Sequence, residues 1–175
     1  MRRHALLLPL LATAGIGHAQ GLPLIDFSVR GGYTWSDRFT NNNGDRVRLE
    51  GFEVGADIPF SGFVPGLSMS LSPSIFLGGA TRSGADADGT VIRLHLTTRS
   101  PVDVGPLYSG AGFGWSFGTG RGNSFDSVNA FSGKFFVGYR LSAGPVPMAP
   151  SVELTYHQSG KAQLRGWTIG IAASF

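Results

Sequence analysis

The feature that most constrains this chain is an alternation of large apolar residues with small or polar ones, repeated in eight segments. A period of two is typical of a β-strand with two chemically different faces. The segments span residues 25–36, 46–58, 67–78, 90–99, 106–117, 126–141, 150–157 and 164–175. Turn-forming Gly, Pro, Asn, Asp and Ser fill the breaks between them. No helical pattern follows residue 19. We therefore predict an all-β fold, an eight-stranded antiparallel up-and-down barrel without exposed sheet edges.

The N-terminus has the pattern of an export signal. Met1-Arg2-Arg3 is followed by an apolar run over residues 5–16 and by the small-residue motif Gly17-His18-Ala19. The run is shorter than the ~20 residues of a transmembrane helix. We predict a cleaved signal peptide over 1–19 and a single barrel domain over 20–175. Loss of Arg2 and Arg3 leaves 12 of the 14 basic residues against 11 acidic ones, so the charge indicates no nucleic-acid partner.

The composition of the two strand faces orients the barrel. One face is rich in Phe, Leu, Ile, Val, Trp and Tyr, and it is too extensive to fit inside eight strands. The other face is mostly Gly and Ser with isolated charges, whereas a soluble surface is dominated by long charged side chains. Charged residues make up only 14% of the chain, against ~25% in soluble domains. We expect the apolar face to contact lipid, which makes this a transmembrane barrel.

The polar face then predicts an ion-paired network that fills the lumen, because an unpaired buried charge costs several kcal/mol. Its expected members are Asp26, Arg30, Arg48, Glu50, Glu53, Asp57, Arg93, His95, Arg99, Lys134, Arg140, Glu153 and His157. Eight strands leave room only for side chains or one small ligand, which excludes a broad pore. A narrow passive channel for water or ions remains the alternative.

The alternation slips in the second segment, where Val47 and Leu49 are followed by Phe52 and Val54. A β-bulge at Gly51 would absorb the extra residue. Alternatively, the strand begins later, at about Glu50.

The connections differ consistently in chemistry. If the chain starts in the periplasm, connections 37–45, 79–89, 118–125 and 158–163 face outward, and they are hydrophilic. Connections 59–66, 100–105 and 142–149 face the periplasm, and they contain Pro59, Pro65, Pro101, Pro145 and Pro147. Such asymmetry is expected of an outer-membrane barrel.

The last strand carries the most specific signal. Trp167, Ile169 and Ile171 alternate with small residues, and the chain ends on Phe175. This ending resembles the C-terminal signature of bacterial outer-membrane proteins, and the whole of 20–175 resembles the small OmpA/OmpX and opacity-protein group of eight-stranded barrels. The resemblance implies a location in the outer membrane, contact with its lipid, and recognition of these four residues by the barrel-assembly machinery.

His157 and Ser159 are the only catalytic candidates, and both are weak. This His-x-Ser pair resembles the lipid A 3-O-deacylase family, in which His, Ser and a downstream Glu form a hydrolytic triad. No Asp or Glu follows Glu153 here, and the strand parity directs His157 into the lumen. A nucleophilic hydroxyl needs a base that a third group orients.

Metal and cofactor signals are weak. Asp86 and Asp88 lie in a Gly-rich loop without the remaining ligands of a calcium loop. We predict no metal and no cofactor, and we assign no oligomeric state. The predicted function is a structural or surface-interaction role in the outer membrane rather than catalysis, with the lipid A hydrolase and the narrow channel as alternatives.

Overall fold

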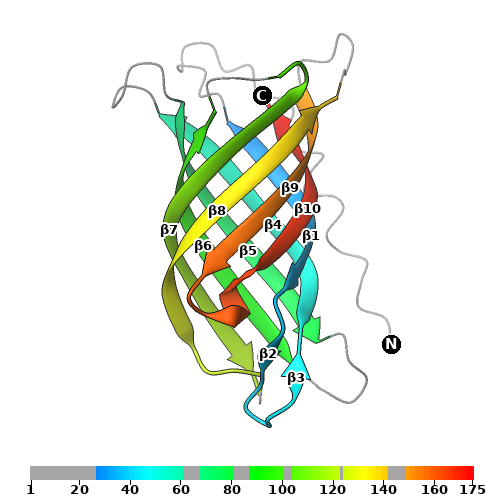
Figure 1. The fold of residues 1–175 in the computed structure, drawn as a ribbon, viewed down its shortest axis with the longest axis vertical. Coiled ribbons are helices and arrows are strands. Elements are labelled where there is room, and N and C mark those ends of the chain that lie inside the picture. Colours follow the sequence, from blue (N-terminus) through cyan, green and yellow to red (C-terminus); the bar gives the residue numbers. More distant parts are fainter. Residues whose placement is uncertain (1–26, 61–67, 81–86, 101–103, 123, 142–148) are drawn as a thin grey trace, which may run out of the picture.

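The computed structural model describes residues 27–60, 68–80, 87–100, 104–122, 124–141 and 149–175. These residues form a closed eight-stranded barrel (Figure 1). Its strands are β1 (Ser28–Ser36), β4 (Leu49–Phe60), β5 (Met69–Ala80), β6 (Asp88–Arg99), β7 (Leu107–Arg121), β8 (Val128–Arg140), β9 (Ala149–Ser159) and β10 (Gly166–Ser174). The predicted eight-stranded barrel is confirmed. The signal peptide predicted over 1–19 and the lumen candidate Asp26 lie outside the described residues.

Strand pairing is antiparallel throughout, and each strand pairs with its neighbours in the sequence. The barrel closes between the first and last strands, from Ser28 opposite Ser174 to Ser36 opposite Gly166. The described helical structure is a single turn, η2 (Ala162–Leu164). No helix among the described residues is long and apolar enough to cross a bilayer.

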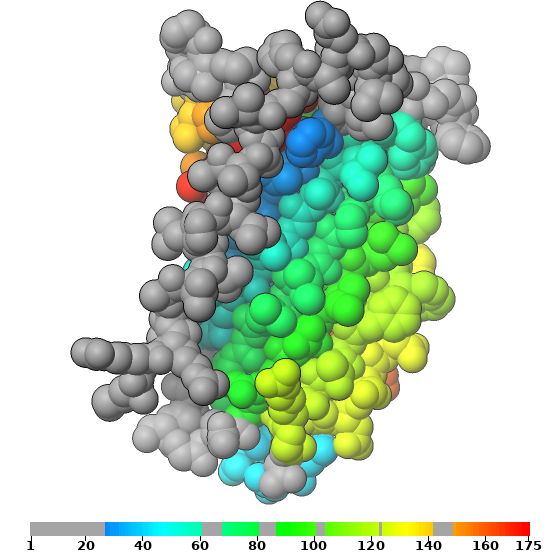
Figure 2. All heavy atoms as spheres, turned by 180° about the vertical axis from the view of Figure 1, so that it is seen from behind, coloured from blue at the N-terminus to red at the C-terminus, as the bar shows by residue number. Residues whose placement is uncertain are grey.

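The two faces of the wall have opposite chemistry, as the alternation predicted. The outer face carries large apolar side chains, among them Phe52 at 71% exposure and Ile171 at 61%. Figure 2 shows the outer wall formed by strands β4 to β7. The inner face buries charged and polar groups, with Arg93 at 2%, Lys134 at 1% and His95 at 0% exposure. This apolar exterior over a polar interior matches the pattern of transmembrane barrels.

The bulge predicted at Gly51 is wrong. Pairing of β4 with β5 runs without interruption from Leu49 opposite Ala80, through Gly51 opposite Gly78, to Phe52 opposite Leu77. The alternative of a later start is close to the structure, because β4 begins at Leu49. Val47 and Leu49 share the inward parity of Glu53 and are 1% and 0% exposed. They are apolar because they point into an apolar cluster inside the barrel.

This cluster closes one end of the barrel, and we call it the apolar plug. Its buried members are Phe39, Val47, Leu49, Phe76, Ala87, Val91, Phe125 and Leu164. A hairpin of β2 (Phe39–Thr40) and β3 (Arg46–Val47) extends beyond the barrel wall at this end (Figure 1). The rings of Phe39 and Phe125 meet edge to face, 5.6 Å between centroids. Side chains from the hairpin, from strands β4 to β6 and from the connection after β7 therefore seal the lumen together.

Candidate functional site

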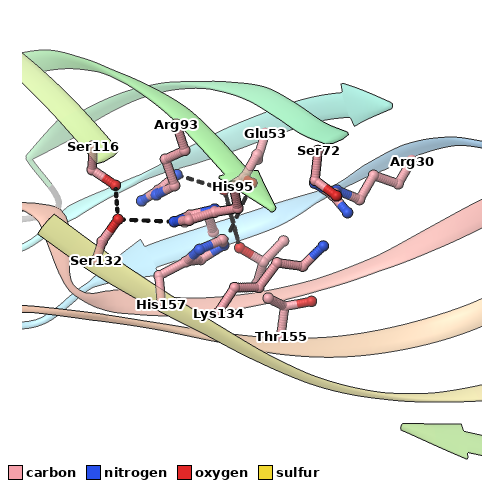
Figure 3. Close-up of polar contacts among 12 residues, drawn as sticks. Arg30, Glu53, Ser72, Arg93, His95, Ser116, Ser132, Lys134, Thr155 and His157 are labelled. Carbon is pink, nitrogen blue, oxygen red and sulfur yellow. Dashed lines mark hydrogen bonds and ion pairs between the residues drawn. The ribbon is translucent and has the colours of Figure 1, made fainter. Parts of the chain in front are cut away.

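Glu53 on β4 is the centre of the polar lumen (Figure 3). Its Oε2 accepts a hydrogen bond from Nη1 of Arg93 at 2.8 Å, and its Oε1 lies 3.4 Å from Nε2 of His157. The hydroxyls of Thr34 and Thr168 donate to the same carboxylate at 3.4 and 3.3 Å. Glu53 and Arg93 are each at most 3% exposed. A buried pair of this kind is held by its geometry, since each charge alone would be uncompensated.

A second ion-paired group surrounds Asp57, four residues further along β4. Nη1 of Arg30 donates to Asp57 Oδ1 at 2.8 Å, and Lys134 Nζ lies 3.8 Å from the same oxygen. The hydroxyl of Ser72 also donates to this oxygen. Lys134 further lies over the ring of Phe136, 4.8 Å from its centroid. Residues of β1, β5 and β8 thus share one carboxylate across the lumen.

Two histidines fill the space next to Glu53. The rings of His95 and His157 stack at a centroid distance of 5.9 Å. His95 Nε2 lies 2.8 Å from the hydroxyl oxygen of Ser132, which lies 2.7 Å from that of Ser116. Figure 3 shows the hydrogen bonds that join Ser116, Ser132 and His95. The histidines are thereby held within the polar network.

A third polar group lies toward the end of the barrel opposite the plug. The Tyr108 hydroxyl lies 2.7 Å from that of Ser151 and donates to Glu153 at 3.4 Å. The Arg99 guanidinium lies over the Tyr108 ring, 4.4 Å from its centroid, and that of Arg140 lies 5.4 Å away. Stacked arginines are favourable partners for an aromatic face.

The structure therefore brings most of the predicted lumen residues together. Those that lie in the three groups are Arg30, Glu53, Asp57, Arg93, His95, Arg99, Lys134, Arg140, Glu153 and His157. Two others do not belong to them. Glu50 accepts a hydrogen bond from the exposed Tyr33 hydroxyl at 2.7 Å, and Arg48 lies 3.9 Å from Glu50. Glu50 has the opposite parity to Glu53, which places this pair on the outer wall and corrects their predicted place in the lumen.

The catalytic candidates His157 and Ser159 both face the interior, with exposures of 1% and 4%. The structure supplies a carboxylate for His157 that the sequence did not suggest, namely Glu53 on a distant strand. The inward parity of Glu53 was the only available signal. The Ser159 hydroxyl accepts from the backbone N–H of Lys161 at 3.3 Å, and no hydrogen bond joins it to His157 among the described residues. A buried, unlinked pair lacks the arrangement of a nucleophile and its base.

The described ranges contain no group of three His, Asp or Glu side chains placed to hold a metal ion. Asp88 begins β6, and Asp86 lies outside the described residues.

The proposed assembly residues form one lipid-facing row. Trp167, Ile169, Ile171 and Phe175 are 39%, 49%, 61% and 40% exposed. The Phe175 ring stacks on Phe27 at 5.2 Å, where the last strand meets the first. Recognition of this row by the assembly machinery stays a prediction.

Comparison with known proteins supports the fold. No known protein family matches the sequence, and a search of curated proteins finds no match. The structure is similar to the crystal structure of Neisserial surface protein A, with a TM-score of 0.53 and 11% identity over 85% of this chain and 95% of that one. It is also similar to the outer membrane protein Ail of Yersinia pestis in a bilayer nanodisc, with a TM-score of 0.51 and 14% identity over 86% and 99% of the two chains.

At identities this low, the structural similarity establishes a shared fold and nothing more. The resemblance predicted from the sequence is confirmed at the level of the fold. The fold and its apolar exterior both support the predicted location in the bacterial outer membrane. The chain has the fold of the small, eight-stranded outer-membrane β-barrels.

Proposed function

We propose that this protein is a structural or surface-interaction barrel of the bacterial outer membrane, with a closed, ion-paired lumen and no catalytic activity. The observation that carries the proposal is the double closure of the interior. The apolar plug, with Leu49 and Leu164 at 0% exposure, fills one end. The Glu53 and Asp57 groups fill the middle with buried, ion-paired side chains. An interior of this kind favours rigidity over transport.

The hairpin β2–β3 supports a role at the surface. Its inner side chains, Phe39 and Val47, are buried in the plug, while Arg38, Thr40 and Arg46 are exposed on the other side. Asn41 Oδ1 accepts from the backbone N–H groups of Asn43 and Asp45 at 3.1 and 2.7 Å, which stabilises the tip. An ordered, amphipathic hairpin offers a partner a rigid polar surface, because little conformational entropy is lost on binding.

Planar-bilayer recording tests the closed lumen. We expect the purified protein to insert without single-channel conductance. A multiple variant serves as the control for sensitivity. It removes large side chains of the apolar plug and the central ion pair by Phe39→Ala, Phe125→Ala, Leu164→Ala, Glu53→Ala and Arg93→Ala. This variant should conduct a measurable ionic current. Regular openings of the unaltered protein would contradict the proposal and favour a narrow channel.

Lipid A mass spectrometry tests the hydrolase alternative. We expect identical lipid A from cells with and without the protein. A matched pair of variants, His157→Ala and His95→Ala, removes one or the other stacked lumen ring. If lipid A loses an acyl chain in cells with the unaltered protein or His95→Ala, but not in cells with His157→Ala, the protein is a hydrolase. That result would overturn the proposal.

A further inference from the structure

The end of the barrel opposite the apolar plug holds an open cavity of about 600 Å³. We call it the vestibule, and its principal lining residues are Phe27, Asp57, Met69, Arg99, Phe136 and Phe175. Sites for small ligands typically have volumes of roughly 300–1,000 Å³ and combine an apolar wall with a few polar groups. The vestibule has this size and this mixture, and the functions discussed above do not use it.

The apolar wall of the vestibule runs from the lumen to the lipid-facing rim. Phe136 is 6% exposed and points inward from β8. Phe27 and Phe175 are 37% and 40% exposed, and their rings stack where β1 and β10 close the barrel. An apolar chain lying along Phe136 would therefore reach the edge of the membrane.

The inner part of the vestibule has more cationic groups than anionic partners. Arg99 lines it, and Lys134 lies behind its wall over the Phe136 ring. Asp57 is the one carboxylate among the described lining residues. That carboxylate already pairs with Arg30 and Ser72 and faces Lys134. The Arg99 guanidinium is stacked on the Tyr108 ring, 4.4 Å from its centroid.

Two buried donors at the vestibule have no hydrogen-bond acceptor among the described residues. They are Thr97 Oγ1, which lines it, and Lys134 Nζ behind its wall. Thr97 lines the vestibule at 3% exposure, and Lys134 is 1% exposed. Buried donors are nearly always satisfied by protein, by water or by a ligand, because an orphaned one costs about 1–3 kcal/mol. An anion in the vestibule would accept from them and balance the excess charge.

We propose that the vestibule binds an amphipathic anion. Its carboxylate or phosphate head lies toward Arg99, Thr97 and Lys134, and its apolar chain follows Phe136 toward Phe27 and Phe175. This inference is independent of the closed lumen, since the apolar plug lies at the opposite end of the barrel. The two sources of such a ligand are a soluble amphiphile and an anionic lipid of the surrounding membrane.

The chain contains no cysteine, which allows a direct test with a single introduced thiol. Ser70 lines the vestibule and lies opposite Thr97 on the neighbouring strand. In nanodiscs of zwitterionic phospholipid, we divide each rate at Ser70→Cys by the rate of the same reagent with a free thiol. We expect this relative rate to be about tenfold higher for an anionic methanethiosulfonate than for its cationic counterpart, because a basic cleft concentrates anions. Arg99→Gln should reduce this ratio. Arg121→Gln, the same charge change at the plug end, should not.

Ligand protection completes the test. Decanoate should slow modification of Ser70→Cys at least severalfold, whereas decanol, which lacks the charge, and acetate, which lacks the chain, should not. Replacing part of the lipid with phosphatidylglycerol then identifies the source. If phosphatidylglycerol alone slows the labelling of Ser70→Cys, without decanoate, the site binds membrane lipid. Labelling of Ser127→Cys at the plug end measures, and corrects for, the effect of the membrane's surface potential. Protection by decanoate alone assigns it to a soluble amphiphile.

Either of two results would overturn the proposal. One is that the anionic and cationic reagents have equal rates at Ser70→Cys relative to their rates with a free thiol. The other is the same protection by decanol or by acetate as by decanoate, since water would then satisfy the buried donors.

Discussion

Glu53 is a single buried carboxylate on which the stability of the folded barrel depends. It is 3% exposed and neutralises Arg93, which is 2% exposed. Glu53→Gln keeps the shape but leaves the guanidinium without its counter-charge. We expect a loss of about 3–5 kcal/mol in the free energy of unfolding, the usual result of breaking a buried pair from one side. Urea unfolding in detergent micelles or lipid vesicles, followed by tryptophan fluorescence, measures it.

Glu50→Gln is the matched control, because Glu50 lies three residues away on the outer wall. It bonds to Tyr33 and lies near Arg48 in a more exposed setting. Exposed pairs contribute little, so we expect a loss of about 1 kcal/mol or less. Equal losses in the free energy of unfolding would show that the buried Glu53–Arg93 pair contributes no more to stability than the exposed contacts of Glu50.

The double variant Glu53→Leu with Arg93→Met separates the strength of the pair from the cost of leaving it half broken. Removing both charges avoids an unpaired ion, so the double variant should unfold at higher urea than either single variant. Additive losses in the same unfolding measurement would contradict this expectation.

Strand parity alone identified Glu53, Arg93 and His157 as inward-facing residues. It did not predict that these three would meet, because they lie on β4, β6 and β9, which are not neighbours in the sheet. Contacts across a lumen depend on the barrel's diameter and on the stagger of its strands. Neither quantity can be read from the alternation of one strand.

At the level of the strands, glycines allow the walls to approach closely. A Cβ on the inward-facing Gly114 of β7 would overlap the carbonyl oxygen of Leu94 on β6. Gly114→Ala should therefore force the two strands apart and cost about 1–3 kcal/mol. Gly133→Ala on β8, where the nearest atom would be 3.7 Å away, should be neutral or slightly stabilising. Comparison of their urea midpoints checks this, and equal effects would contradict the close-packing account.

The final strand allows a separate prediction about assembly. If the barrel-assembly machinery recognises Phe175, Phe175→Ala should reduce the amount of folded protein in the outer membrane of cells. Refolding of the purified variant in detergent micelles should be nearly unchanged. Phe131→Ala removes another lipid-facing aromatic, 58% exposed on β8, and serves as control. A parallel defect in both variants, or a refolding defect of Phe175→Ala in vitro, would indicate a structural role only.

The alternation of residues predicted the number of strands and their faces, but not the apolar plug. If Val47 and Leu49 belonged to the same apolar face as Phe52 and Val54, a bulge at Gly51 would be needed, which is why the sequence predicts one. Their parity in fact matches that of Glu53, and continuous pairing with β5 confirms it. An apolar residue inside a polar lumen is unexpected until the loops that cover it are known.

The whole molecule should behave as one closed unit. Each of the eight barrel strands is paired on both sides, including β1 with β10, so the barrel wall offers detergent no free edge from which to begin unfolding. We expect the unheated protein to migrate differently from the boiled protein on a denaturing gel. The heating temperature that abolishes the difference should fall for Glu53→Gln and remain unchanged for Gly133→Ala. Identical mobility before and after boiling would contradict the closed barrel.

The hairpin β2–β3 projects past the plug with its turn in solvent, and Gly44 there has a positive φ of 87°. The side chains that seal the lumen lie on β2 and β3 rather than in this turn. A foreign peptide spliced between Asn43 and Gly44 would therefore leave the seal intact. If this end faces outward, as the loop chemistry predicts, the barrel becomes a compact carrier for displaying epitopes on living bacteria.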